Sequence, residues 1–216
     1  MIGASNRQSP RARLFSPTNA RGFTLMEMLV ALGIFSVVMA TATDIYIMAG
    51  RGQRKALNLE RVQSDARFTL EAITREVRTG IIDYDYYENR EEPISLPDED
   101  LAIVASDNTR IRFFRSDEDT NGYCPDTASI PCVLVKVGAS EPASVTPRGV
   151  VAYNLKFYIS PDVDPNYYDS GPGGGWLSDV QPHVTTVLHL SSTGGRWAEQ
   201  GEVYIQSTAT SRTYRR

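Results

Sequence analysis

A chain of 216 residues, 41% of them hydrophobic and 22% charged, allows one domain of ordinary size and is too apolar for disorder throughout. Its formal net charge is −4, but residues 1–22 contain four arginines and no acidic residue, so residues 23–216 carry −4 − (+4) = −8. An acidic body argues against non-specific nucleic-acid binding, because such binding neutralises phosphates with cationic side chains.

The first predicted element is an apolar helix that contains one misplaced charge. Residues 23–43 form an apolar run that is interrupted by a single charged residue, Glu27. At about 1.5 Å per residue they would span ~32 Å, close to the hydrocarbon thickness of a bilayer. A plain membrane anchor would look like this, and so would a secretory signal peptide cleaved after Ala42 in the motif Ala40-Thr41-Ala42. Neither explains Glu27, since a carboxylate inside such a helix costs roughly 2.5–3.5 kcal/mol.

The residues around Glu27 resemble the processing site of type IV prepilins and pseudopilins. That pattern is a short basic leader ending in Gly, then Phe, a Thr-Leu pair, and Glu as the fifth residue of the mature chain. The sequence Gly22-Phe23-Thr24-Leu25-Met26-Glu27 has the same residues in the same order. The resemblance implies that an inner-membrane prepilin peptidase cleaves after Gly22 and methylates the new amino terminus of Phe23.

The resemblance also implies a role for Glu27 in assembly. Cleavage creates a cationic amine in apolar surroundings, where an unpaired charge is costly. Glu27 of a neighbouring subunit would neutralise that amine in a filament. The implied partners are the peptidase, other pilin or pseudopilin subunits and an inner-membrane assembly platform. The implied location is the inner membrane, crossed once with the head exported, and then a pilus or pseudopilus in the periplasm or outside the cell.

Residues 51–80 predict an amphipathic continuation of the helix. Its apolar positions recur every three or four residues, at Leu59, Val62, Ala66, Leu70, Ile73 and Val77. This spacing is one helical face, and Gly80 is a suitable stop. Gly50 and Gly52 predict a loosened or kinked join. The expected organisation is a leader over 1–22 that is removed, a membrane and filament-core helix over 23–50, an amphipathic half over 51–80, and a β-rich head over 81–216.

The head is predicted to be an antiparallel sheet against the helix, an α+β, pilin-like fold. Period-two alternation predicts strands over 101–106, 110–115, 132–138, 150–160, 183–191 and 202–210. In the fourth, one face should comprise Val151, Tyr153, Leu155, Phe157 and Ile159. Residues 83–100, which are acidic and rich in tyrosine, are expected to be an exposed connection. The glycine-rich stretch 170–176 is expected to be a flexible surface loop.

The tip between the second and third predicted strands has two candidate features. Asp117, Asp119 and Asn121 match the start of a calcium loop, D-x-[DN]-x-[DN]-G, but position twelve is Ala128 instead of the bidentate Glu. A polar hairpin tip is the alternative. Cys124 and Cys132 are the only cysteines, and in an oxidising compartment two nearby cysteines usually pair.

The sequence gives little support for an enzyme, since no nucleophile or phosphate-loop motif occurs. His183 and His189 fall on one face of a predicted strand and are interpreted as ordinary strand residues. Residues 63–78 are similar to the second half of the helix in larger minor pilins and the J-type pseudopilin. The head of about 136 residues also suits a minor subunit, which leaves pilus and type II secretion pseudopilus as alternatives.

Overall fold

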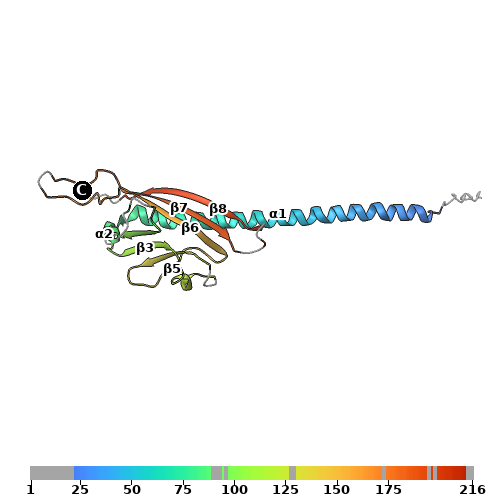
Figure 1. The fold of residues 1–216 in the computed structure, drawn as a ribbon, viewed down its shortest axis with the longest axis horizontal. Coiled ribbons are helices and arrows are strands. Elements are labelled where there is room, and N and C mark those ends of the chain that lie inside the picture. The colour runs from blue at the N-terminus through green and yellow to red at the C-terminus, as the bar shows by residue number, and fades with distance from the viewer. Residues whose placement is uncertain are drawn as a thin grey trace, which may run out of the picture. The chain divides into compact units, whose positions relative to one another are not determined.

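The computed structural model describes residues 22–88, 94, 97–126, 130–171, 174–193, 196 and 199–212. The chain divides between Met48 and Ala49 into two compact units. The first unit contains the apolar half of the long N-terminal helix. The second contains the amphipathic half of that helix and all the strands, and its internal arrangement is described below (Figure 1).

The predicted helices form one element, α1 (Leu25–Thr79). Helical structure continues through Gly50 and Gly52, and a loosened or kinked join at these residues stays a prediction. A Cβ at either glycine would meet nothing within 4 Å, so neither is required for packing within this chain. Gly80 ends the helix as predicted, and a Cβ there would collide with the side chain of Ile103.

The first sheet is antiparallel and has the order β1-β2-β3-β4-β5. Its strands are β1 (Ile81–Ile82), β2 (Asp100–Val104), β3 (Arg110–Arg115), β4 (Val133–Val137) and β5 (Ala143–Ser144). The three longer strands were predicted to within two residues. The two-residue strands at the edges were not, because two residues are too few to show an alternating pattern.

The second sheet is also antiparallel and has the order β6-β7-β8. Its strands are β6 (Val150–Ser160), β7 (His183–Ser192) and β8 (Glu202–Thr210), within one residue of the prediction. The predicted face of β6 holds only beyond its bulge, because Val150 and Ala152, and not Val151, join Leu155, Phe157 and Ile159 in the core. A bulge between Ala152 and Asn154 turns Tyr153 outwards, so that its side chain is exposed.

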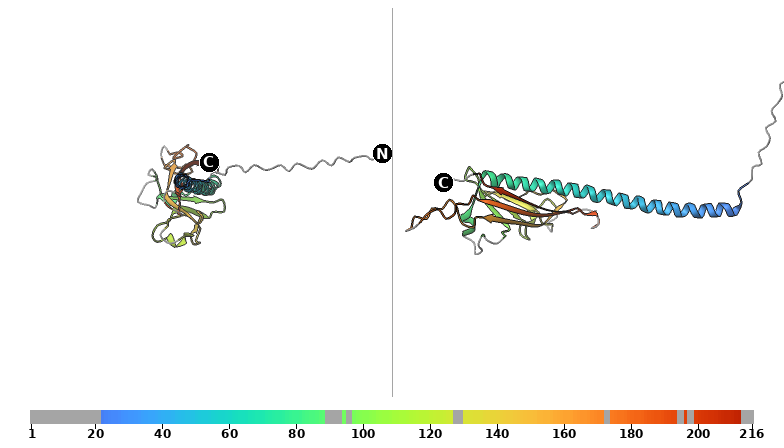
Figure 2. Two further views of the ribbon diagram at one scale, coloured as in Figure 1. Left: turned by 90° about the vertical axis from the view of Figure 1, so that its right-hand side faces the viewer. Right: turned by 90° about the horizontal axis from the view of Figure 1, so that it is seen from above.

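The core lies between the amphipathic half of α1 and the two sheets. Five of the six residues of the predicted stripe are buried, and Leu59 is partly buried. Strand β8 follows this half of the helix (Figure 2). Near its beginning Gly201 packs on the backbone of Leu59, and just after its end the Arg212 amide donates to the Arg78 carbonyl. The structure therefore confirms an α+β, pilin-like architecture, with the helix packed against two sheets instead of one.

The expectation of an exposed connection over 83–100 is wrong for several of its described residues, although Asp85, Glu88 and Glu99 are exposed. A short helix, α2 (Tyr84–Glu88), starts this segment. Tyr84, Tyr87 and Asp98 are buried. Tyrosine permits this because its ring packs in the core while its hydroxyl finds a partner. Here the Tyr84 hydroxyl donates to the Pro161 carbonyl at 3.1 Å.

Candidate processing and assembly site

The backbone around the predicted cleavage position is not helical at residues 22–24, and α1 begins at Leu25. Thr24 caps α1, since its hydroxyl oxygen accepts from the Glu27 amide at 3.2 Å and its carbonyl accepts from the Met28 amide at 3.2 Å. The Gly22–Phe23 bond therefore lies outside the helix, and both residues are exposed. A bond in such backbone can enter a peptidase active site without unwinding a helical turn.

The described surroundings of Gly22 do not require a glycine at this position. A Cβ at this position would meet nothing within 4 Å, so a larger side chain fits the described part of the chain. The glycine is therefore better explained by a protein that acts on the chain than by the folding of the chain itself.

Glu27 has a local explanation that can be weighed against the assembly hypothesis. Thr24 and Glu27 occupy the first and last positions of a capping box, where a carboxylate favours the positive end of the helix dipole. That effect is worth about 0.3–1 kcal/mol. It is smaller than the roughly 2.5–3.5 kcal/mol that the same carboxylate costs within a bilayer. Capping alone therefore does not account for Glu27 in a membrane helix.

The apolar half of α1 presents hydrophobic side chains on all sides. Its most apolar 18-residue window has a mean hydropathy of 2.1 and is not buried at all within the chain. The exposed large side chains include Phe23, Leu25, Met26, Leu29, Leu32, Ile34, Phe35, Val38, Ile45 and Tyr46. By length and composition this helix can cross a membrane. Exposure on this scale requires lipid or other protein to cover it, because each such side chain gains ~1.5–3 kcal/mol when removed from water.

The hydroxyl groups in this half are compatible with an apolar environment. Ser36, Thr41 and Thr43 donate to carbonyls of their own helix at 2.7, 2.9 and 2.8 Å. Each donor is satisfied without water, which is the condition that a hydrocarbon environment imposes.

At the candidate calcium site in the β3–β4 tip, two of the three proposed ligand side chains already accept hydrogen bonds within the chain. Asp117 Oδ1 accepts from the Thr120 amide and hydroxyl at 2.9 and 2.6 Å, and these bonds lower the pKa of Asp117. Asn121 Oδ1 accepts from Ser116 at 2.6 Å. Over the described ranges, no three His, Cys, Asp or Glu side chains are grouped to hold a metal ion. Calcium binding at Asp117, Asp119 and Asn121 stays a prediction, and Ala128 lies outside the described residues.

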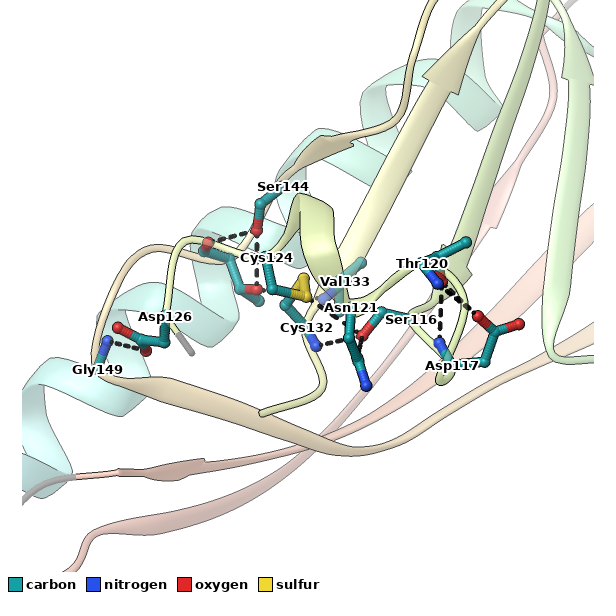
Figure 3. Close-up of a disulfide and its surroundings, with 11 residues drawn as sticks. Ser116, Asp117, Thr120, Asn121, Cys124, Asp126, Cys132, Val133, Ser144 and Gly149 are labelled. Carbon is teal, nitrogen blue, oxygen red and sulfur yellow. Dashed lines mark hydrogen bonds between the residues drawn. A yellow bond between two sulfur atoms is a disulfide. The ribbon is translucent and has the colours of Figure 1, made fainter. Parts of the chain in front are cut away.

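The two cysteines close this tip. Cys124 and Cys132 form a disulfide with a Cα–Cα distance of 5.8 Å, as Figure 3 shows. The bond is buried beside Phe114 and Leu134, apart from the main core. Asp126, which lies in the same tip, accepts a hydrogen bond from the Gly149 amide at 2.7 Å. The tip is therefore hydrogen-bonded to Gly149, just before β6, and it is closed by the disulfide.

His189 lies in a side-chain cluster that the sequence did not indicate. Its ring stacks on Tyr204 at 3.9 Å between centroids, and its Nε2 lies 2.6 Å from Glu202 Oε1. The Tyr204 hydroxyl donates to the same carboxylate oxygen at 2.9 Å, and these contacts lower the pKa of Glu202. His189 and Tyr204 are register partners on β7 and β8, so only the strand pairing could have revealed the cluster. The contacts are those of cross-strand packing.

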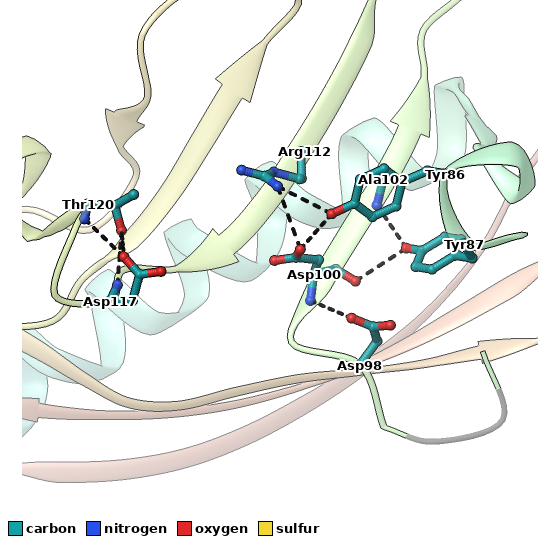
Figure 4. Close-up of polar contacts among 8 residues, drawn as sticks. All are labelled: Tyr86, Tyr87, Asp98, Asp100, Ala102, Arg112, Asp117 and Thr120. Carbon is teal, nitrogen blue, oxygen red and sulfur yellow. Dashed lines mark hydrogen bonds and ion pairs between the residues drawn. The ribbon is translucent and has the colours of Figure 1, made fainter. Parts of the chain in front are cut away.

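A second polar network that the sequence missed ties α2 to the first sheet (Figure 4). The Tyr86 hydroxyl donates to Asp100 Oδ2 at 2.7 Å and accepts from Arg112 at 3.2 Å. Tyr87 accepts from the Ala102 amide at 2.9 Å, and burial raises the pKa of its hydroxyl. This network is structural, since it satisfies buried polar groups between α2 and β2.

Comparison with known proteins identifies the N-terminal segment alone. Residues 17–43 match the family model described as the prokaryotic N-terminal methylation motif, a family of structural, pilin-like proteins. No curated protein and no solved structure gives a significant match. The matched segment includes Gly22, Phe23 and Glu27 and the first turns of α1. The chain therefore carries the type IV prepilin-like signature, that of a processed pilin- or pseudopilin-like subunit, on an α+β, pilin-like architecture.

Proposed function

We propose that the chain is a minor structural subunit of a type IV pilus or a type II secretion pseudopilus, and that it is not an enzyme. The observation that carries the proposal is the arrangement at the start of α1. An accessible Gly22–Phe23 bond precedes a helix that is exposed and apolar on all sides, with Glu27 in its first turn. Prepilin peptidase would remove residues 1–22, and the apolar half would hold the chain in the inner membrane until assembly.

Assembly would replace lipid around the apolar half with the same half of other subunits. The amine of Phe23 and the carboxylate of Glu27 carry opposite charges, and pairing them between subunits would offset the cost of removing both from water. Because these groups are four residues apart on each chain, the pairing would also fix the axial position of one helix against the next.

The head favours a minor position over a repeated shaft position. It combines two sheets and connecting segments over about 136 residues, which is large for a subunit that must repeat densely. Pilus and pseudopilus remain the two forms of the proposal. Isolation of sheared surface filaments, as against a periplasmic complex with secretion components, separates them.

The first test is the mature N-terminus of the chain, determined by intact and tandem mass spectrometry from cells that contain prepilin peptidase. N-methylated Phe23 is the expected first residue. A first residue of Thr43 would instead establish the alternative, a secreted soluble binding protein or enzyme whose signal peptide ends at Ala42. Gly22→Val should abolish processing, whereas Gly33→Val, whose Cβ also meets nothing within 4 Å, should leave it intact.

The role of Glu27 is tested by Glu27→Gln. Glutamine keeps the size of the side chain and can serve in a capping box, but it removes the charge. Processing at Phe23 should persist while co-fractionation with other pilin-like chains is lost. Glu60→Gln, an exposed position in the amphipathic half, is the matched control. Assembly at the parental level by Glu27→Gln would show that Glu27 acts only as a cap.

A further inference from the structure

In its described residues, 161–171 and 174–182, the connection between β6 and β7 forms a hairpin that projects beyond the strand ends (Figure 1). Its two arms meet in a bridge between Tyr168 and Trp176, whose rings contact edge to face at 5.2 Å. The Asp169 amide donates to Gly175 at 2.9 Å, and a Cβ at Gly174 would collide with the Asp169 backbone. The expected flexible loop over 170–176 is therefore part of a hydrogen-bonded hairpin in its described residues.

This acidic hairpin, as residues 161–182 are called below, exposes apolar side chains beside negative charge. Its exposed large residues are Val163, Tyr167, Tyr168, Trp176, Leu177 and Val180. It contains four aspartates and no other charged residue, a net charge of −4. Several exposed apolar side chains on one short hairpin are typical of an interaction site, and Trp and Tyr are among the residues that most often dominate protein interfaces.

A complementary surface lies on the same chain, on the face of α1 opposite the buried stripe. There Phe68 is 61% exposed, although it belongs to the amphipathic half. It borders a groove of about 520 Å³ that Ala72, Arg75, Arg78 and Arg212 also line. The lining of this basic groove, as it is called below, contains three arginines and one acidic residue, Glu71, a charge of +3 − 1 = +2. Arg75 also pairs with Glu76, next to the lining, at 3.2 Å.

Within one chain, the described residues of neither surface cover the other surface. Trp176 is 41% exposed, and the described lining of the basic groove contains no residue of the acidic hairpin. Opposite net charges, an apolar centre on each surface and a groove able to take an aromatic side chain between arginines all favour contact between chains. Arginine beside an aromatic face adds a cation–π attraction.

We propose that the acidic hairpin of one copy docks in the basic groove of a second copy, with Trp176 entering beside Phe68. The inference rests on the proposed function, because the membrane and the filament are what bring copies together. It requires two adjacent copies, so a minor subunit would have at least one neighbour of its own kind.

The test uses two differently tagged full-length chains expressed together in cells with the assembly machinery. One carries Ala72→Cys in the basic groove and the other Ser178→Cys in the acidic hairpin, while the native cysteines are engaged in their disulfide. A short bis-maleimide should join the two tags into one mixed dimer. Gln206→Cys, an exposed position on β8, replaces Ala72→Cys in the control and should give no mixed dimer.

Charge and aromatic variants then establish what holds the contact. Arg75→Glu with Arg78→Glu, or Trp176→Ala, should lower the mixed-dimer yield at least about tenfold, as loss of an interface centre does. Tyr158→Ala, an exposed aromatic outside the acidic hairpin, should leave it unchanged. Asp162→Lys with Asp179→Lys on the partner copy should restore the yield lost through the arginine reversals. Near-UV circular dichroism of each variant verifies that its head is folded.

The outcomes separate this inference from the proposed function. No mixed dimer from chains that begin at Phe23 and co-fractionate with other pilin-like chains would overturn the docking contact and leave the filament role intact. A mixed dimer whose yield the reversals and Trp176→Ala do not change would also overturn it. Failure of processing at Gly22 would instead count against the proposed function itself.

Discussion

The two halves of α1 have the same secondary structure but opposite relations to their surroundings. In the apolar half, Ile34 is 63% exposed, and large apolar side chains surround the helix on all sides. In the amphipathic half, Ile73 is 1% exposed, and the apolar residues form one stripe against the sheets. Hydrogen bonds make both halves helical, but the distribution of apolar residues decides what covers each half. The amphipathic half is covered by its own chain, and the apolar half needs lipid or other chains.

An isoleucine-to-alanine substitution in each half is the most direct test of this difference between the halves. Ile73→Ala should lower the free energy of unfolding of the head by about 2–5 kcal/mol, because it leaves a cavity in the core. Ile34→Ala should change it by less than about 0.5 kcal/mol, because the Ile34 side chain is exposed. Thermal unfolding of the full chain in detergent micelles, followed by near-UV circular dichroism, measures both. Equal effects would refute the division.

Loss of the disulfide should be the next largest effect and should be confined to the head. Cys124→Ala with Cys132→Ala is expected to lower the free energy of unfolding by about 2–3 kcal/mol, since the unfolded chain is no longer constrained. Denaturant titration of the variant beside the parent measures the difference. Reduction of the parent should reproduce the loss, and an unchanged midpoint after reduction would contradict it. Insertion of the apolar half into membranes should not change.

The buried hydrogen-bond network of α2 provides a test of what stabilises the head. Tyr87→Phe removes the hydroxyl that accepts a hydrogen bond from the Ala102 amide. The Ala102 amide then stays buried without that partner. A cost of about 1–3 kcal/mol is expected. Tyr158→Phe, at a position 49% exposed, should stay within about 0.5 kcal/mol. Paired chemical denaturation curves would detect the difference, and similar values would remove the case for a structural network.

The smallest expected effect depends on pH. The hydrogen bond from Lys156, at 2.6 Å, holds the pKa of Glu99 below its ordinary value of 4.5. A carboxyl group whose pKa is lower in the folded state stabilises the fold above its ordinary pKa and loses that contribution as the pH falls through the folded value. Glu99 is largely exposed, so the contribution is at most about 1 kcal/mol.

Lys156→Met should therefore reduce the melting temperature at pH 7 and have progressively less effect as the pH is lowered past 4.5. Lys55→Met, an exposed position on α1, is the control and should show no such trend. Melting curves recorded across this pH range decide the matter. A difference between variant and parent that is constant with pH would assign the effect of Lys156 to packing of its aliphatic chain.

Some features of the fold follow from local sequence alone. The stripe from Leu59 to Val77 predicted the buried face of the helix, because burial against a single partner imposes a period near 3.6. Alternation likewise placed β3, β6 and β8 with their observed bounds. The exposed connection predicted over 83–100 failed because composition counts tyrosine and aspartate as polar, whereas their burial depends on partners such as Pro161 and Ala102 that are distant along the chain.

By itself, the sequence determined the processing motif at Gly22 to Glu27, the length of the apolar run and the periodicity of the amphipathic half of the helix. These are local properties, because a peptidase, a bilayer and a helical face each act on residues close together in the chain. Only the tertiary structure decided the division of the strands into two sheets, the cluster of His189 with Glu202 and Tyr204, and the exposure of the acidic hairpin and the basic groove. Those features join residues far apart in the chain, and nothing in their local spacing records which strands will pair or which surfaces will remain uncovered.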